Sequence, residues 1–266
     1  MSVGRGSIPA MSPSAAEYAW FDRIRAMYCM TYVKGLTPSE FLSRVGVTPY
    51  PDQNGLSSLY STHWTDPLDI DNHWRFIGAT QVQGDGGPWT LAIESNGWIG
   101  ESDEYMSPAS AGTQVLSHYQ NASGRTSFNW WEDGELRTTF EFPHSRRGST
   151  PDDLIEAMRR VGFDVSPEAE SPGQLAKLAL AEELSGVRVT AELLANSSYA
   201  CGYFGELPAV YRNDGKVSAP RPEPEACPPR IESRVSDEQS QVPRPEGLGR
   251  GLRALGPRPP GLDQES

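Results

Sequence analysis

The sequence has few cysteines, no long apolar run and no leader-like N-terminus. Its three cysteines, Cys29, Cys201 and Cys227, lie far apart, and none belongs to a C-x-x-C pair. This excludes a disulfide framework and favours a reducing compartment. No window approaches the ~18–20 apolar residues that a membrane span needs, and no apolar region follows Arg5. We therefore expect a cytoplasmic protein without a membrane partner.

Basic residues are also scarce and scattered. Residues 1–204 contain 14 Lys+Arg against 25 Asp+Glu, whereas residues 205–266 contain 9 against 10. Binding of nucleic acid requires clustered Lys and Arg, and the only candidates are the Arg-Arg pairs at 146–147 and 159–160. We expect no nucleic-acid partner, because an acidic domain suits a basic protein instead.

Aromatic residues are confined to the first three quarters of the chain. All seven tryptophans lie between Trp20 and Trp131, while residues 205–266 have one aromatic residue and eleven prolines. Such a tail cannot bury enough apolar surface to offset the entropy of ordering, so we expect it to be disordered. We expect the same of residues 1–14, which leaves one α+β domain over residues 15–204.

Three segments carry the same signals for the start and end of a helix. A Thr or Ser that can accept from the free N–H groups precedes a proline at the first helical position, and a glycine ends the segment. Two further helices are predicted over residues 14–25 and at "TAELLA". The three capped segments run from Thr37 to Gly46, from Thr150 to Gly162 and from Ser171 to Gly186.

Strand-like runs follow one another between residues 74 and 142, after an earlier one at "YCMTYV". They are short, rich in β-branched or aromatic residues and separated by Gly, Asn and Asp turns, and "GDGG" at 84–87 is one of these turns. Because strand-rich and helix-rich stretches are segregated, we predict an α+β fold. We expect an antiparallel sheet of about five strands, packed by helices on one face.

The hairpin "RTSFNWWEDGELRTTFEF" allows two registers. A two-residue turn at Asp133-Gly134 pairs Trp131 with Leu136 and mixes apolar and polar residues on each face. A three-residue loop with a bulge at Gly134 pairs Trp130 with Leu136 and gathers the apolar residues on one side. We prefer the second register.

The preferred register leaves Trp131 on a polar face, with Asn129 opposite Arg137. A tryptophan among charges either tucks under a loop or helix or forms part of a binding surface. The candidate binding surface consists of Trp131, Asn129 and Arg137, with Glu94 as a fourth member.

Glu94 ends the predicted strand in "PWTLAIESNGW". It is out of phase with Trp89, Leu91 and Ile93, so it points away from their face. We expect a solvated carboxylate that accepts from turn N–H groups. A role in acid–base chemistry would require a nearby His, Lys or second carboxylate, and its neighbours in the sequence supply none.

Five segments, in this order, resemble an actinobacterial family of unknown function, number 6461: "CMTYVKGLTPSEFLSRVGV", "PWTLAIESNGW", "WEDGELRTTFEF", "GSTPDDLIEAMRRVGFD" and "LALAEELSGVRVTAELL". The resemblance covers Trp20 to Leu194. It implies a cytoplasmic α+β domain with no established activity, so it assigns no catalytic residue. Pro108 interrupts "ESDEYMSPASAG", where the family has a cleaner helix, and the tail from Gly205 lies outside the resemblance.

Sequence signals for metal, phosphate and covalent chemistry are weak. No G-x-S-x-G elbow occurs, Cys29 lies in an apolar run that favours an inert thiol, and the "GDGG" turn lacks the lysine of a phosphate loop. One stretch, "HWTDPLDIDNHW", gathers candidate metal ligands, but they match neither a helical pair nor a calcium loop. Its candidate ligands are His63, Asp66, Asp69, Asp71 and His73.

These observations favour a non-catalytic protein-interaction module, of the immunity or regulatory kind, over an enzyme. We expect no cofactor and no metal, and the oligomeric state is left open. One alternative is a small hydrolase or transferase in which Glu94 meets Asp69 or Asp71 in three dimensions. Another is a small-ligand sensor whose pocket is lined by three tryptophans, Trp89, Trp98 and Trp130.

Overall fold

The computed structural model describes residues 12–23, 27–64, 76–95, 97–168 and 173–204, which belong to one compact unit. The predictions for residues 1–11 and for the tail from 205 lie outside the described residues. No described helix is long and apolar enough to cross a membrane. The elements are η1 (Ala15–Arg23), β1 (Tyr28–Lys34), α1 (Pro38–Arg44), β2 (Thr48–Asn54), α2 (Gly55–Trp64), β3 (Phe76–Gly84), β4 (Gly87–Glu94), η3 (Ile99–Glu101), α3 (Asp103–Ala109), β5 (Gln114–Gln120), β6 (Thr126–Glu132), β7 (Glu135–Phe140), α4 (Ile155–Arg160), α5 (Gly173–Ser185), α6 (Ala191–Asn196) and β8 (Ser198–Tyr203).

The fold is α+β, as predicted, but the antiparallel sheet has eight strands rather than about five. Their order is β2-β8-β3-β4-β1-β5-β6-β7. Two of the strands, β2 and β8, were not predicted. Strand β2 contains Pro49 and Pro51, which a central strand excludes, and it lies at the edge of the sheet, where proline is tolerated.

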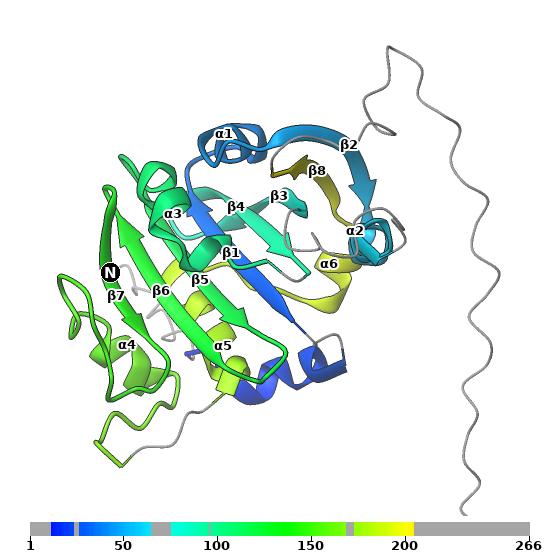
Figure 1. The fold of residues 1–266 in the computed structure, drawn as a ribbon. Helices are drawn as coiled ribbons and strands as arrows, with labels where there is room; N and C mark the ends of the chain where they lie inside the picture. Colours follow the sequence, from blue (N-terminus) through cyan, green and yellow to red (C-terminus); the bar gives the residue numbers. More distant parts are fainter. Residues whose placement is uncertain (1–11, 24–26, 65–75, 96, 169–172, 205–266) are drawn as a thin grey trace, which may run out of the picture. The chain divides into compact units, whose positions relative to one another are not determined.

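Helices cover both faces of the sheet, so the prediction of one covered face is wrong. On the first face, α5 packs in a large apolar cluster with η1 and the odd-numbered residues of β4, including Leu91. On the second face, α1 and α3 supply Phe41 and Met106 to a smaller cluster that also contains Ala92. In Figure 1, α3 lies in front of the sheet and α5 behind it. Most strands are therefore buried on both sides.

The hairpin of β6 and β7 adopts the register that the sequence analysis rejected. Its turn has two residues, Asp133 and Gly134, with φ of 52° and 82°, and Trp131 pairs with Leu136. A β-bulge at Arg137 then shifts the register, so that Trp130 faces Thr138 and the apolar residues further along still meet. The bulge that aligns the apolar residues lies one step inside the strand, not at Gly134.

One predicted helix cap was confirmed, and another helix starts later in the sequence than predicted. Thr37 caps α1 and forms a capping box with Glu40, as the sequence predicts. Helix α4 starts at Ile155, several residues after the predicted cap at Thr150. The backbone of Thr150 is already bonded to β7, since its N–H donates to the Arg137 carbonyl at 2.9 Å and its own carbonyl accepts from Thr138 Oγ1 at 2.7 Å.

The predicted glycine signals were confirmed. All three glycines expected to end helices have positive φ, and the "GDGG" stretch forms the turn between β3 and β4, where Gly84 pairs with Gly87. The cap predicted at Ser171 lies outside the described residues. The three helix-ending residues are Gly46 (75°), Gly162 (95°) and Gly186 (68°).

Candidate functional site

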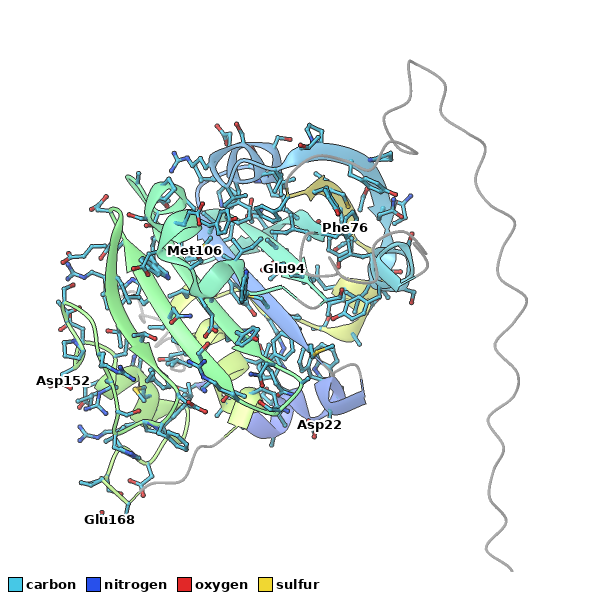
Figure 2. The ribbon with its side chains drawn as sticks, viewed as in Figure 1. Asp22, Phe76, Glu94, Met106, Asp152 and Glu168 are labelled. Carbon is cyan, nitrogen blue, oxygen red and sulfur yellow. The ribbon has the colours of Figure 1, made fainter. Side chains whose placement is uncertain are left out.

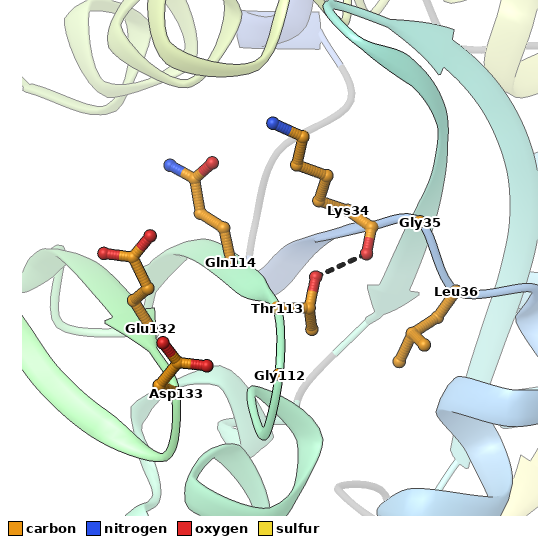
Figure 3. A pocket seen from close by; sticks show the side chains of 8 residues that line it. All are labelled: Lys34, Gly35, Leu36, Gly112, Thr113, Gln114, Glu132 and Asp133. Carbon is orange, nitrogen blue, oxygen red and sulfur yellow. Dashed lines mark hydrogen bonds between the residues drawn. The ribbon is translucent and has the colours of Figure 1, made fainter.

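An open pocket of about 400 Å³ lies at one end of the sheet. It forms where β1 runs into α1, where α3 leads into β5, and where β6 turns into β7. Figure 3 shows that its lining comes from three separate segments of the chain. The lining residues are Lys34, Gly35, Leu36, Gly112, Thr113, Gln114, Glu132 and Asp133.

The walls of the pocket are held together by hydrogen bonds between these segments. Thr113 Oγ1 donates to the Lys34 carbonyl at 2.5 Å, and the Asp133 N–H donates to the Thr113 carbonyl at 3.2 Å. The Lys34 ammonium lies over the Trp89 ring, 5.9 Å from its centroid. The pocket therefore has a backbone frame held by hydrogen bonds, with charged side chains around it.

The two carboxylates of the pocket have no cationic partner. Among the described residues, neither Glu132 nor Asp133 forms an ion pair, whereas Glu135, which follows them in the hairpin, pairs with Arg137. In Figure 3 both carboxylates stand on the same side of the pocket, away from the Lys34 ammonium. Two unpaired carboxylates beside a cavity form a region of negative potential that suits a cationic group.

Glu94 is buried, so the prediction of a solvated carboxylate is wrong. Its side chain is 1 % exposed, opposite Cys29 in the β1–β4 pair, and Figure 2 shows it in the interior. Its direction was predicted correctly, but η3 covers the face to which it points. Glu94 Oε2 accepts from the Ile99 N–H at 3.1 Å, and Oε1 has no partner among the described residues.

Burial dominates the electrostatics of Glu94. It raises the pKa of the carboxyl well above its ordinary value, although the adjacent Cys29 thiol and the Ile99 and Trp98 backbone N–H groups lower it. The Cys29 thiol is fully buried, as expected, and burial raises its pKa too. Burial therefore disfavours the charged form of both groups, and Glu94 holds the η3 turn through its bond with the Ile99 N–H.

Trp131 does not lie on an exposed polar face. Its side chain is 2 % exposed and packs in the cluster that α1 and α3 form on the second face of the sheet. Of the two alternatives that the sequence left open, burial under a helix is the one observed.

The other members of the predicted binding surface lie apart. Asn129 is buried and donates to the Gly100 carbonyl at 3.2 Å and to Ser117 Oγ at 3.1 Å. Arg137 is half-buried, 5.7 Å from the Trp130 ring centroid, with Glu135 at 3.5 Å and Asp153 at 3.8 Å. The structure therefore does not bring Trp131, Asn129, Arg137 and Glu94 to one open surface.

The alternative sites receive no support from the geometry. Asp66, Asp69, Asp71 and His73 lie outside the described residues, and so does the side chain of His63. Within the described residues, no three His, Cys, Asp or Glu side chains gather so that they could hold a metal ion. Of the three tryptophans predicted to line a ligand pocket, Trp89 is buried and Trp98 is 52 % exposed, and none of the three lines the pocket beside Lys34.

Comparison with known proteins identifies the family. The model of a family of unknown function, DUF6461, matches residues 11–209. The chain belongs to this family. No curated protein and no solved structure matches the chain.

This DUF6461 domain contains two buried ionisable residues that the sequence analysis missed. His118 lies between two tyrosines, with Nε2 3.0 Å from Tyr32 Oη and Nδ1 3.2 Å from Tyr28 Oη. Lys177 lies on α5, with a fully buried side chain that points towards the sheet. A signal was available for Lys177, because it shares the helical stripe of Leu178 and Ala181, which faces the sheet.

His118 should make the domain sensitive to acid. Burial, with the nearby Lys177 charge, lowers the pKa of His118 from 6.5 to about 3, so the folded state keeps the ring neutral. As the pH falls below about 6.5, the unfolded chain binds a proton that the folded chain does not, and stability is lost. We expect His118→Gln to lower the slope of unfolding free energy against pH, between pH 6 and 4, by about 1 kcal/mol per pH unit.

The measurement is urea unfolding across this pH range. The exposed residue His144 provides the matched control, and His144→Gln should keep the wild-type slope. An unchanged slope in His118→Gln would show that the ring is not held neutral by its surroundings. Glu94 changes the stability with pH in the opposite direction to His118, since its raised pKa favours the folded state at low pH. Because Glu94 is present in both variants, its effect cancels when their slopes are compared.

Proposed function

We propose that this domain is a non-catalytic interaction module that takes a cationic side chain of a protein partner into the pocket beside Lys34. The observation that carries the proposal is the pair of carboxylates, Glu132 and Asp133, that line the pocket without a cationic partner. An acidic domain attracts a basic protein over a distance, and the pocket then supplies a specific point of contact.

The distribution of reactive groups supports binding rather than catalysis. Cys29, Glu94, His118 and Lys177 are each 1 % exposed or less, so a substrate does not reach them. In the pocket, the hydroxyl of Thr113 already donates to a backbone carbonyl, and no thiol or imidazole is present in its lining. A regulatory or immunity-type role fits a domain that binds its partner through a charged pocket and performs no reaction.

The same features favour a protein partner in the cytoplasm over a nucleic acid. Carboxylates repel phosphates, whereas they pair with Lys and Arg side chains. Cys29 and Cys201 are both free and buried, which suits a reducing compartment.

A titration with arginine amide, followed by NMR, tests the proposal. Citrulline amide is the matched probe, because it has the same shape without the charge. We expect arginine amide, and not citrulline amide, to shift the backbone amide signals of Gly35, Gly112 and Thr113. The double variant Glu132→Gln/Asp133→Asn should bind arginine amide several-fold more weakly, because both charges of the pocket are lost.

A second double variant controls for net charge. Asp52→Asn/Glu168→Gln removes two exposed carboxylates elsewhere and should bind like the wild type. Equal shifts with both probes, or equal weakening by both double variants, would contradict the proposal.

A further inference from the structure

Lys177 reaches from α5 into the interior and contacts the ends of β6 and β7 on the face of the sheet that α5 covers. Its side chain is fully buried, and Nζ donates to Thr126 Oγ1 at 2.6 Å and to the Glu141 carbonyl at 3.0 Å. Nζ also lies 5.6 Å from the centroid of the Phe140 ring. The amine therefore connects one helix with the ends of both β6 and β7.

The surroundings of Lys177 suit a neutral amine. The charged and titratable groups around it are His118, Arg125, Glu101 and Glu141. Neither carboxylate pairs with Lys177, because that of Glu141 is 3.5 Å from Arg125 and that of Glu101 accepts from the Ser127 hydroxyl. A neutral amine has two N–H groups, and Thr126 and Glu141 supply two acceptors, so an ammonium would carry one N–H too many.

Glu141 begins a segment that folds back along the edge of the sheet. In this edge segment, residues 141–150, Arg147 and Thr139 exchange two backbone hydrogen bonds of 2.7 and 2.9 Å. The segment ends where the Thr150 N–H donates to the Arg137 carbonyl. The bond from Lys177 is therefore a contact between α5 and the start of the edge segment.

We propose that Lys177 forms a pH-sensitive contact between α5 and the edge segment, which is tight when the amine is neutral and loosened when it is protonated. The amine is anchored to the segment's first residue, so a change in its protonation acts where the segment leaves β7.

The direction of the pH effect follows from the site. Burial lowers the pKa of Lys177 from 10.5 to about 7, although the Glu141 and Glu101 carboxylates raise it. As the pH rises through 7, the folded chain releases a proton that the open or unfolded chain keeps. The closed contact therefore gains stability as the pH rises from about 7 towards 10.5, whereas well below pH 7 both states hold the proton and its stability no longer changes.

Hydrogen exchange of the Thr139 and Arg147 amides, corrected for the intrinsic effect of pH, tests the proposal in the full chain. We expect their protection to rise roughly fivefold or more between pH 6 and pH 8. Lys177→Met has a similar length and no charge, so its protection should rise much less than that of the wild type over this range. Lys34→Met, which removes an exposed lysine, should keep the wild-type increase.

A second measurement on the wild type does not depend on any variant. The Lys177 ¹³Cε signal should titrate with a midpoint near pH 7. A midpoint above pH 9, or protection that rises equally in wild type and Lys177→Met, would overturn the proposal.

Discussion

Replacing Gly97 with alanine should lower the free energy of unfolding by about 3 kcal/mol. Gly97 is buried, and a Cβ at this position would overlap the Glu94 carboxylate and lie 2.7 Å from Glu94 Cβ. Glu94 cannot move aside, because it is buried on a central strand and bonded to the Ile99 N–H. Urea unfolding measures the loss.

A double-mutant cycle isolates this contact. The nearest atoms around a Cβ at position 97 all belong to Glu94. Gly97→Ala should therefore cost at least about 1 kcal/mol less in a Glu94→Ala background than in the wild type. Strictly additive losses would show that Glu94 does not pack against Gly97, and the buried position assigned to the carboxyl would be wrong.

Replacing Gly148 with alanine should cost a similar amount, about 3 kcal/mol, and should detach the edge segment from β7. Gly148 has a φ of 121°, and an added Cβ would overlap the Arg137 carbonyl oxygen and lie 2.6 Å from its carbonyl carbon. These are backbone atoms, so rotation of a side chain cannot relieve the overlap. Thermal unfolding measures the loss, and hydrogen exchange at Thr139 and Arg147 locates it.

Gly124 provides the matched control for backbone strain. It also has a positive φ, of 82°, but an added Cβ there would meet nothing within 4 Å. Gly124→Ala should therefore show only the cost of a left-handed residue, about 1 kcal/mol. Equal losses at the two positions would mean that the edge segment does not approach Arg137 as closely as described.

Much of the fold could be predicted from the sequence, because local chemistry determines the element boundaries. The capping box at Thr37, the glycines that end helices and the turn at 84–87 each depend on a few neighbouring residues, and each was confirmed. The displaced start of α4 shows the limit. Thr150 has the correct residue type for a cap, but its backbone is bonded to β7, a partner distant in sequence.

The site was harder to predict, because the second face of the sheet looks polar in the sequence. Ser117, Ser127 and Asn129 would suit a solvated face, yet each hydrogen-bonds to residues of η3 and is buried beneath it. Only the folded chain places a helix over them. The same η3 turn covers Glu94, and α1 and α3 cover Trp131, although the alternation of β4 and β6 gave the correct side for both.

The pocket was missed for a different reason. Lys34, Thr113 and Asp133 come from three segments that are separate in the sequence, and none belongs to a recognisable motif. Their meeting depends on the order of the strands, since β1, β5 and β6 are neighbours in the sheet. No pattern of residues within one segment predicts such a site.

Helices cover both faces of the sheet, and for this reason we propose that the partner binds at its end. The most direct test measures how a soluble gadolinium chelate broadens the indole N–H signals of the tryptophans. We predict strong broadening for Trp98, which is 52 % exposed, and little for Trp131, which is 2 % exposed. Equal broadening of the two signals would contradict the account, because the second face of the sheet would then be open to solvent.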